Sequence, residues 1–312
     1  MYYPILRGRQ NELLAVKELC EARILSAKII PIIEPVKLSP TLVNTVDSMN
    51  QQGCQCVVIR NPKVGSFRSD SRNQKNEKNL ERLLKIINED NNILRGFIID
   101  SNAEMVINDW RQQVQSDDYI LTLCLEPDAI KYYQAAKIGD SDIRVVIPYS
   151  PAFRRIRKQR ILVEDKFNKK ARNSDYLDED DEFFSSDHLF FDEDHEYIGF
   201  SDYSIIGEEY SEAGFAPYAV AIHIVYFDNE NNLRIHHFVS ENNDDITDPA
   251  GKFYEALEKL VDWNQEMKLD TVGIKKFEEI FEAQTYPGLG VVKKLSIMHH
   301  FELLGRFLDK KK

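Results

Sequence analysis

Residues 28–50 read KIIPIIEPVKLSPTLVNTVDSMN, and this stretch decides the fold. It opens with a short run rich in Ile that lacks the strict alternation of a half-exposed strand, which is typical of a parallel strand buried on both faces. The run ends at Glu34, and Ser39 with Pro40 then supplies a helix cap followed by a proline in the first turn. The stretch therefore predicts one strand followed by one helix.

The same order of a short apolar run and a longer helical pattern repeats along the chain. The runs are Tyr2–Leu6, Lys28–Ile33, Cys54–Ile59, Gly96–Ile99, Tyr119–Leu125, Ile143–Ile147, Arg160–Val163 and Tyr197–Phe200. The helical patterns between them include Gln10–Leu25, Thr41–Asn50, Asn76–Asn88, Ala103–Gln113, Asp128–Ala136 and a short basic one, Ala152–Lys158. Alternating strands and helices indicate a parallel sheet, and eight strands close a (β/α)8 TIM-like barrel.

An open, doubly wound sheet is the alternative arrangement of these strands. A dinucleotide-binding sheet of that kind carries G-x-G-x-x-G after its first strand. The first run here is followed by Arg-Gly-Arg-Gln at 7–10, which does not match. We therefore predict an α/β fold with a closed barrel.

Two segments interrupt the repeat near its end. Residues 173–196 form a strongly acidic segment, which we expect to be a surface loop or a partner-binding flap. The runs 218–227 and 233–239, joined by Asp-Asn-Glu-Asn-Asn, predict an antiparallel hairpin within 217–240. Lys252–Trp263 is expected to be the eighth barrel helix. The predicted domains are thus a barrel over 1–265 and a helical C-terminal extension over 266–312.

Composition and charge narrow the classes of partner. Of the 312 residues, 43% are hydrophobic and 29% are charged, as in ordinary globular proteins. The net charge of −12 repels polyanions, so nucleic acid is not an expected partner unless a basic patch is present. The sequence shows neither a secretory signal nor an apolar run long enough to span a membrane, so we expect a cytoplasmic protein.

The four cysteines give no metal-binding pattern. Cys54 and Cys56 form a C-x-C pair without a second pair or a nearby His to complete a zinc site. We therefore expect them to be packed thiols.

Polar side chains follow the predicted strands, at the end where barrel active sites lie. They are Arg7, Glu34, Arg60, Asn61, Asp100, Asp165, Lys166, Asp202 and Tyr203, to which His237 of the hairpin is added if the hairpin folds over the barrel mouth. The expected catalytic residues are Glu34, Asp165, Lys166 and Asp202. The expected substrate-binding residues are Arg7, Arg60, Asn61, Tyr203 and His237. Glu34, Asp100 and Asp202 are candidate Mg²⁺ ligands.

The chemistry of such a ring supports two interpretations. Arginines bind phosphate or carboxylate groups bidentately, and carboxylates bind divalent cations or transfer protons. The alternative is a ring of mutually satisfied ion pairs that caps the barrel. Phe200 and Asp202 are two residues apart on the last predicted strand, so their side chains point to the same face of the sheet. If Phe200 faces the barrel interior, Asp202 does too. We then expect Arg7 or Lys166 to lie within hydrogen-bond distance of Asp202, directly or through one water molecule.

A basic segment offers a second place for a phosphate. Residues 154–172 hold nine Lys or Arg among nineteen positions, just before the acidic segment. This arrangement has two interpretations. The basic and acidic segments neutralise each other across a surface, or the basic segment binds nucleic acid or a nucleotide phosphate that the acidic segment covers. No motif of a Ser-His-Asp hydrolase, a Walker A loop or a kinase is present.

Several motifs resemble a bacterial family related to the phage "beta protein" group. They are YYPILRGRQNEL at 2–13, IIPIIEPVK at 29–37, GFSDYSI at 199–205, APYAVAIH at 216–223 and HHFVS at 236–240. The resemblance implies a two-gene module on mobile islands, with the neighbouring gene's product as partner and phage defence as the setting. It implies no reaction.

Two functions follow from the sequence. The first is an enzyme, a metal-assisted hydrolase or lyase, that acts on a phosphate-containing small molecule or nucleotide at the barrel mouth. The alternative is a non-catalytic component that binds a partner protein through the hairpin, the acidic segment and the C-terminal helices.

Overall fold

The computed structural model describes residues 1–89, 92–114, 116–193, 197–211 and 218–311. The chain forms two compact units, unit 1 with residues 1–165 and 187–203 and unit 2 with residues 166–186 and 204–312. This division differs from the predicted boundary at residue 265, because the hairpin and the helices that follow it pack together in unit 2. Residues 194–196 of the predicted acidic loop and residue 217 of the predicted hairpin lie outside the described part.

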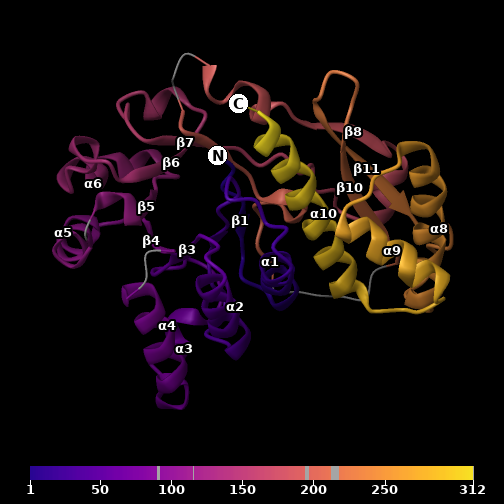
Figure 1. Cartoon of the computed structure of the whole chain (residues 1–312), viewed down its shortest axis with the longest axis horizontal. Coiled ribbons are helices and arrows are strands. Elements are labelled where there is room, and N and C mark those ends of the chain that lie inside the picture. Colours follow the sequence, from indigo (N-terminus) through magenta and orange to yellow (C-terminus); the bar gives the residue numbers. More distant parts are fainter. Residues whose placement is uncertain (90–91, 115, 194–196, 212–217, 312) are drawn as a thin grey trace. The chain divides into compact units, whose positions relative to one another are not determined.

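Unit 1 contains a parallel eight-stranded sheet with helices around it (Figure 1). Its strands, in spatial order, are β1 (Ile5–Leu6), β2 (Ile32–Ile33), β3 (Cys56–Ile59), β4 (Ile93–Ile98), β5 (Ile120–Leu123), β6 (Arg144–Pro148), β7 (Arg160–Val163) and β9 (Gly199–Ser201). The amides of Tyr3 and Ile5 donate to the carbonyls of Phe200 and Asp202, both at 2.8 Å, and join the first strand to the last. The predicted (β/α)8 barrel is therefore confirmed.

The helices of unit 1 follow most of its strands. They are α1 (Gln10–Glu21), α2 (Pro40–Gln51), α3 (Phe67–Asp70), α4 (Glu77–Glu89), α5 (Ala103–Gln113), α6 (Ile130–Ala135) and α7 (Asp187–Phe190). The Ser39 side chain accepts a hydrogen bond from the amide of Leu42, as its cap position predicts. The predicted helix 152–158 is absent from this described segment, where only the 3-10 turn Pro151–Phe153 connects β6 to β7. The segment leaves little room for a helix, because six residues after Phe153 the chain adopts a left-handed conformation at Gln159, with a φ of 51°, and β7 begins at Arg160.

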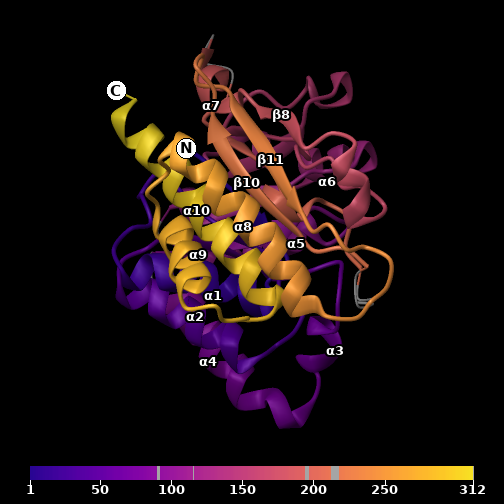
Figure 2. The same cartoon turned by 90° about the vertical axis from the view of Figure 1, so that its right-hand side faces the viewer.

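Unit 2 is a three-stranded antiparallel sheet with three helices (Figure 2). Its strands are β10 (Ala221–Phe227), β11 (Leu233–Val239) and β8 (Asp181–Ser185), in the order β10-β11-β8, and its helices are α8 (Pro249–Met267), α9 (Val272–Glu282) and α10 (Leu289–Lys310). The predicted hairpin is confirmed. Two expectations are corrected: part of the acidic loop is strand β8, and the expected eighth barrel helix is α8, which packs on β10 and β11.

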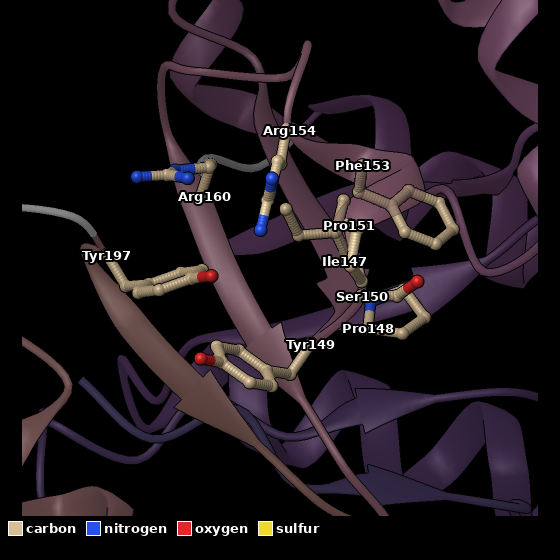
Figure 3. Close-up of a pocket in the computed structure, with 9 residues that line it drawn as sticks. All are labelled: Ile147, Pro148, Tyr149, Ser150, Pro151, Phe153, Arg154, Arg160 and Tyr197. Carbon is tan, nitrogen blue, oxygen red and sulfur yellow. The ribbon is translucent and has the colours of Figure 1, made fainter.

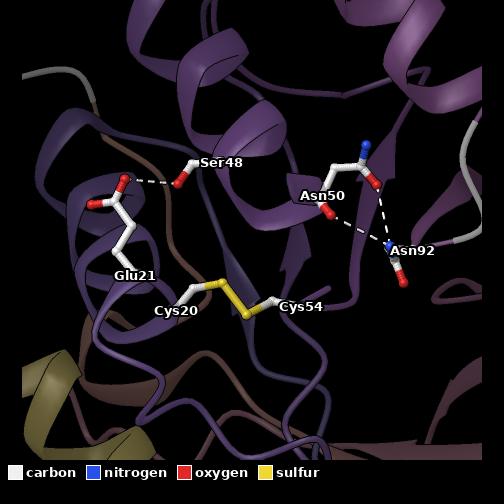
Figure 4. Close-up of a disulfide and its surroundings, with 6 residues drawn as sticks. All are labelled: Cys20, Glu21, Ser48, Asn50, Cys54 and Asn92. Atoms are coloured by element: carbon white, nitrogen blue, oxygen red, sulfur yellow. Dashed lines mark hydrogen bonds between the residues drawn. A yellow bond between two sulfur atoms is a disulfide. The ribbon is translucent and has the colours of Figure 1, made fainter. Parts of the chain in front are cut away.

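A disulfide joins Cys20, at the end of α1, to Cys54, which follows α2 (Figure 4). The two Cα atoms are 6.3 Å apart, within the usual range for a disulfide. The expectation that Cys54 is a packed thiol is therefore wrong, because the α1–α2 contact brings a partner from 34 residues away. Cys56 and Cys124 are the buried free thiols, and burial raises the pKa of each to about 12.

None of the described helices combines the length and the apolar composition that a membrane crossing requires.

Candidate functional site

The interior of the barrel can be followed from Gly96 on β4. A Cβ atom at Gly96 would lie 2.6 Å from the side chain of Ile59 and 2.8 Å from that of Val57, so these three positions face the interior. Because side chains alternate along a strand, Asn61 and Asp100 point to the same side where β3 and β4 end. These carboxyl ends of the strands form the mouth of the barrel.

Arg7 and Glu34 form the central ion pair of the mouth. The Arg7 guanidinium donates to Glu34 Oε2, and the amide of Lys63 donates to Glu34 Oε1 at 2.7 Å. The carbon at the centre of that guanidinium lies 5.0 Å from the centroid of the Tyr203 ring. Glu34 and Tyr203 are both buried, so this pair is largely shielded from water.

Asn61 and Asp100 extend the network to the next two strands. The Asn61 amide nitrogen donates to the carbonyl of Ile98 at 2.7 Å and to Asp100 Oδ2 at 3.3 Å, and the Lys63 ammonium is also 3.3 Å from Asp100 Oδ2. Burial acts to raise the pKa of Asp100, but the Asn102 amide and the Lys63 ammonium outweigh it and hold that pKa below its usual value. Asp100 is therefore ionised, and it is not a proton donor near neutral pH.

Asp202 does not lie in the mouth, contrary to expectation. Its parity with Phe200 holds, but Phe200 stacks on Tyr2 with 5.0 Å between ring centroids, and the Tyr2 hydroxyl donates to Asp202 Oδ1 at 2.5 Å. Gly199, one residue before, is the position that faces the interior, because a Cβ there would be 2.7 Å from the Tyr3 ring. Alternation then places Asp202 on the outer face of the wall and Tyr203 on the inner one, because the condition of the prediction, that Phe200 faces the barrel interior, is not met.

Arg60 is also outside the mouth. Its guanidinium carbon lies 5.9 Å from the centroid of the Trp110 ring on α5, in the layer between sheet and helices. Burial, together with the nearby positive charge of Arg95, lowers the pKa of Arg60. Arg60 and Asn61 are adjacent residues after β3, so their side chains point to opposite faces of the sheet, and only Asn61 reaches the mouth.

The remaining predicted residues are divided between the two units. Asp165 ends the first segment of unit 1 and is exposed, whereas Lys166 begins unit 2, and His237 lies on β11 of that unit. Among the described residues no group of three His, Cys, Asp or Glu side chains is arranged to hold a metal ion. Glu34, Asp100 and Asp202 therefore do not fit the Mg²⁺ site that the sequence suggested, chiefly because Asp202 faces the other way.

The charged side chains at the ends of β1 to β4 are accordingly paired with one another. The carboxylates of Glu34 and Asp100 each have a cationic partner and at least one further donor. Such a network holds the ends of four strands together, and it leaves Arg7 neutralised by Glu34 rather than presented to a ligand.

A pocket of about 270 Å³ lies in the outer wall of the barrel, where the helical layer is thin (Figure 3). The short turn Pro151–Phe153 leaves open the outer face of β6 and β7, and Figure 3 shows the side chains of Arg154, Arg160, Tyr149 and Tyr197 around the opening. The Arg160 guanidinium carbon lies 4.6 Å from the centroid of the Tyr197 ring. The pocket thus combines two guanidinium groups with two phenol rings.

The charge around this pocket is unbalanced. Among the described residues, no carboxylate pairs with Arg154, Arg155, Arg157 or Lys158. Within the pocket, Arg154 therefore presents a guanidinium group without a carboxylate partner among the described residues. Such a group on a concave surface attracts an anion, and the planar fork of arginine suits phosphate oxygens. The sequence signal for this site was the basic segment 154–172, which the prediction treated as secondary to the mouth.

Comparisons of the chain with known proteins found no match. No family model matches the chain, and no curated protein or solved structure matches it significantly.

Proposed function

We propose that the protein binds a small phosphate-containing molecule of the nucleotide class in the pocket between β6, β7 and Tyr197. The observation that carries this proposal is the meeting of Arg154 and Arg160 with two tyrosine rings around one cavity. The guanidinium groups supply the donors for a phosphate, and the exposed ring of Tyr149 or the half-buried ring of Tyr197 supplies a stacking surface for a base.

The volume of the pocket and the net charge of the protein favour a small ligand over a nucleic acid. A volume of about 270 Å³ is just below the usual range for ligand pockets, so only a small ligand, or part of one, fits inside. The net charge of −12 opposes the approach of a polyanion, whereas a nucleotide meets only the local field of the basic residues. The proposal keeps the ligand class predicted from the sequence but moves it from the barrel mouth to the outer wall.

The described residues that line this pocket supply guanidinium, phenol and hydroxyl groups, and neither a carboxylate nor an imidazole. Its chemistry is therefore that of binding and orientation.

Isothermal titration calorimetry of the full chain with AMP, adenosine and ribose 5-phosphate tests the proposal. We expect Arg154→Gln to weaken AMP binding by about 10- to 100-fold, since a charge-assisted hydrogen bond contributes about 1.5–3 kcal/mol. Tyr197→Leu should weaken AMP more than ribose 5-phosphate, because only AMP carries a base.

The matched control is Arg72→Gln, which removes an exposed arginine of the β3–β4 connection that does not line the pocket. It should leave AMP binding unchanged. Equal binding of AMP and adenosine, or AMP binding that is the same in Arg154→Gln as in the wild type, would refute the phosphate site. Tighter binding of an oligonucleotide than of AMP would show that the ligand class is wrong.

A second candidate function, binding of a basic partner protein, is favoured by one feature of unit 2. Leu177 and Phe183 are 52% and 55% exposed, and they flank a run of five consecutive acids at 178–182. Exposed apolar side chains surrounded by one sign of charge are typical of protein interfaces. Co-purification with the neighbouring gene's product, which the resemblance implies as partner, should be lost in a Leu177→Ser, Phe183→Ser variant and kept in the wild type.

A further inference from the structure

A second cavity, of about 310 Å³, lies within unit 2. Its walls come from the segment 167–176, from the start of β10 and from α10. Unlike the pocket in the barrel wall, it contains an imidazole, that of His223, and a cluster of lysines. None of its residues took part in the sites described above.

His223 is the end of a chain of hydrogen bonds across the sheet. It lies directly opposite His237 in the register of β10 and β11, and the two Nδ1 atoms are 2.7 Å apart. On the far side of His237, Nε2 lies 3.2 Å from Glu182 Oε1 on β8. One carboxylate and two imidazoles, from three adjacent strands, therefore lie in one line.

The tautomers follow from the partners. A carboxylate oxygen only accepts, so Nε2 of His237 carries the hydrogen, and in the neutral ring its Nδ1 is bare. The short contact between the two Nδ1 atoms then requires His223 to donate from Nδ1, which leaves His223 Nε2 as a bare acceptor. Among the described residues this Nε2 has no hydrogen-bond partner.

The line is fixed in place by its neighbours. The second carboxylate oxygen of Glu182 accepts from the Asn168 side chain at 3.0 Å. The Tyr176 ring lies 4.7 Å from the His223 ring and 4.4 Å from the His237 ring, by centroids. Held rings and a defined tautomer are what a proton-transfer relay requires.

A buried hydroxyl points to a missing ligand. Ser296 of α10 lines the same cavity and is 2% exposed, and its Oγ has no hydrogen-bond partner. A buried hydroxyl without a partner is unfavourable by about 1–3 kcal/mol, so native proteins seldom leave one unsatisfied. A ligand in the cavity would satisfy it.

The charge of the cavity favours an anion. Lys169, Lys170 and Lys293 line it, and the ion pairs of Lys169 with Glu209 and of Lys170 with Glu179 involve exposed carboxylates of the rim. In the free protein, burial, then the neighbouring His237, then Lys293 lower the pKa of His223 well below its usual value. Burial lowers the pKa of His237 as well, against the opposing effect of Glu182.

We propose that this cavity is a binding site for a small anion with a phosphate-like group, and that binding is coupled to the uptake of one proton by His223 Nε2. The proton comes from the solvent and converts the His223 ring to an imidazolium, which donates to the anion. The Nδ1–H of that imidazolium stays bonded to His237, and the Glu182 carboxylate at the other end of the line stabilises the new charge. Ser296 donates its hydroxyl hydrogen to the same anion.

The sign of the pH dependence follows from the groups around His223. In the free protein His223 faces His237 from β11, Lys293 from α10 and Tyr176 from the segment before β8, and it is neutral. An anion beside Nε2 offsets the repulsion by the lysine and favours the charged ring. Affinity should therefore fall about tenfold for each unit of rise in pH over the range in which one proton is taken up.

Sulfate is the suitable probe because it does not titrate between pH 5 and 8. Calorimetry with the full chain, in two buffers of different ionisation enthalpy, measures the protons taken up per sulfate bound. We expect close to one proton at pH 7, and none in His223→Gln, which should bind sulfate weakly and without pH dependence. Ser296→Ala should weaken sulfate binding at least fivefold without lowering the melting temperature, because the hydroxyl that it removes has no partner.

His236→Gln is the matched control, since His236 neighbours His237 on the opposite face of β11, beside Asp181. It should bind sulfate as the wild type does. Arg154→Gln should also leave this proton uptake unchanged, which separates the cavity from the barrel-wall pocket. Sulfate binding without proton uptake, binding that is unaffected by both His223→Gln and Ser296→Ala, or no binding at all would overturn the proposal.

Discussion

Reduction of the Cys20–Cys54 disulfide should destabilise the barrel by about 4 kcal/mol. The bond closes a loop with a sequence separation of 34 residues, which runs from the end of α1 through β2 and α2. The chain-entropy relation for a loop of this length gives about 3.8 kcal/mol at 25 °C. This is the free energy by which reduction stabilises the unfolded state, because the chain without the cross-link has more conformational freedom. Unit 1 contains about 180 residues, for which 1 kcal/mol corresponds to about 2–4 °C.

We therefore expect the melting temperature of the wild type to fall by about 8–16 °C in reductant. The Cys20→Ser, Cys54→Ser variant should melt near the reduced wild type, and its melting temperature should not respond to reductant. A thiol titration of the denatured, unreduced wild type should find the two free thiols of Cys56 and Cys124, not four. Four titrated thiols in protein purified without reductant, or equal melting temperatures with and without reductant, would refute the disulfide.

Three further predictions concern unit 1. Tyr2→Phe removes the hydroxyl that donates to buried Asp202 and should lower the free energy of unfolding in urea by about 1.5–3 kcal/mol; a loss under 0.5 kcal/mol would contradict the buried bond. Gly65→Ala should lower it by about 2–4 kcal/mol, since φ is +73° and the new Cβ would lie 2.3 Å from the carbonyl oxygen of Val36, whereas an unchanged midpoint would exclude this close approach. The lowered pKa of Asp100 contributes stability that is present above its unfolded pKa near 4 and is lost as pH falls through the folded value. Asp100→Asn should therefore lose less stability than the wild type in urea titrations between pH 5 and pH 2, and parallel losses would refute the shift.

The sequence by itself determined the order of strands and helices in the barrel. Short apolar runs such as 28–33 have to be buried on both faces, and that requirement is local, so residues 28–50 already specify a strand, a capped helix and the turn between them. The hairpin at 221–239 was equally readable, because its two runs and their turn are contiguous. The ligand class expected at the barrel followed from the residue types, and it stays a prediction.

The tertiary structure decided which polar residues meet. Each strand end offers two neighbouring side chains of opposite parity, and only the register of the closed sheet selects Asn61 over Arg60 and Tyr203 over Asp202 for the mouth. The disulfide joins residues 34 positions apart, and Glu182 lies 55 positions from its partner His237. Such contacts depend on how α1 packs on α2 and how β8 pairs with β11, and because neither pairing leaves a periodic trace in the sequence, only the folded chain reveals them.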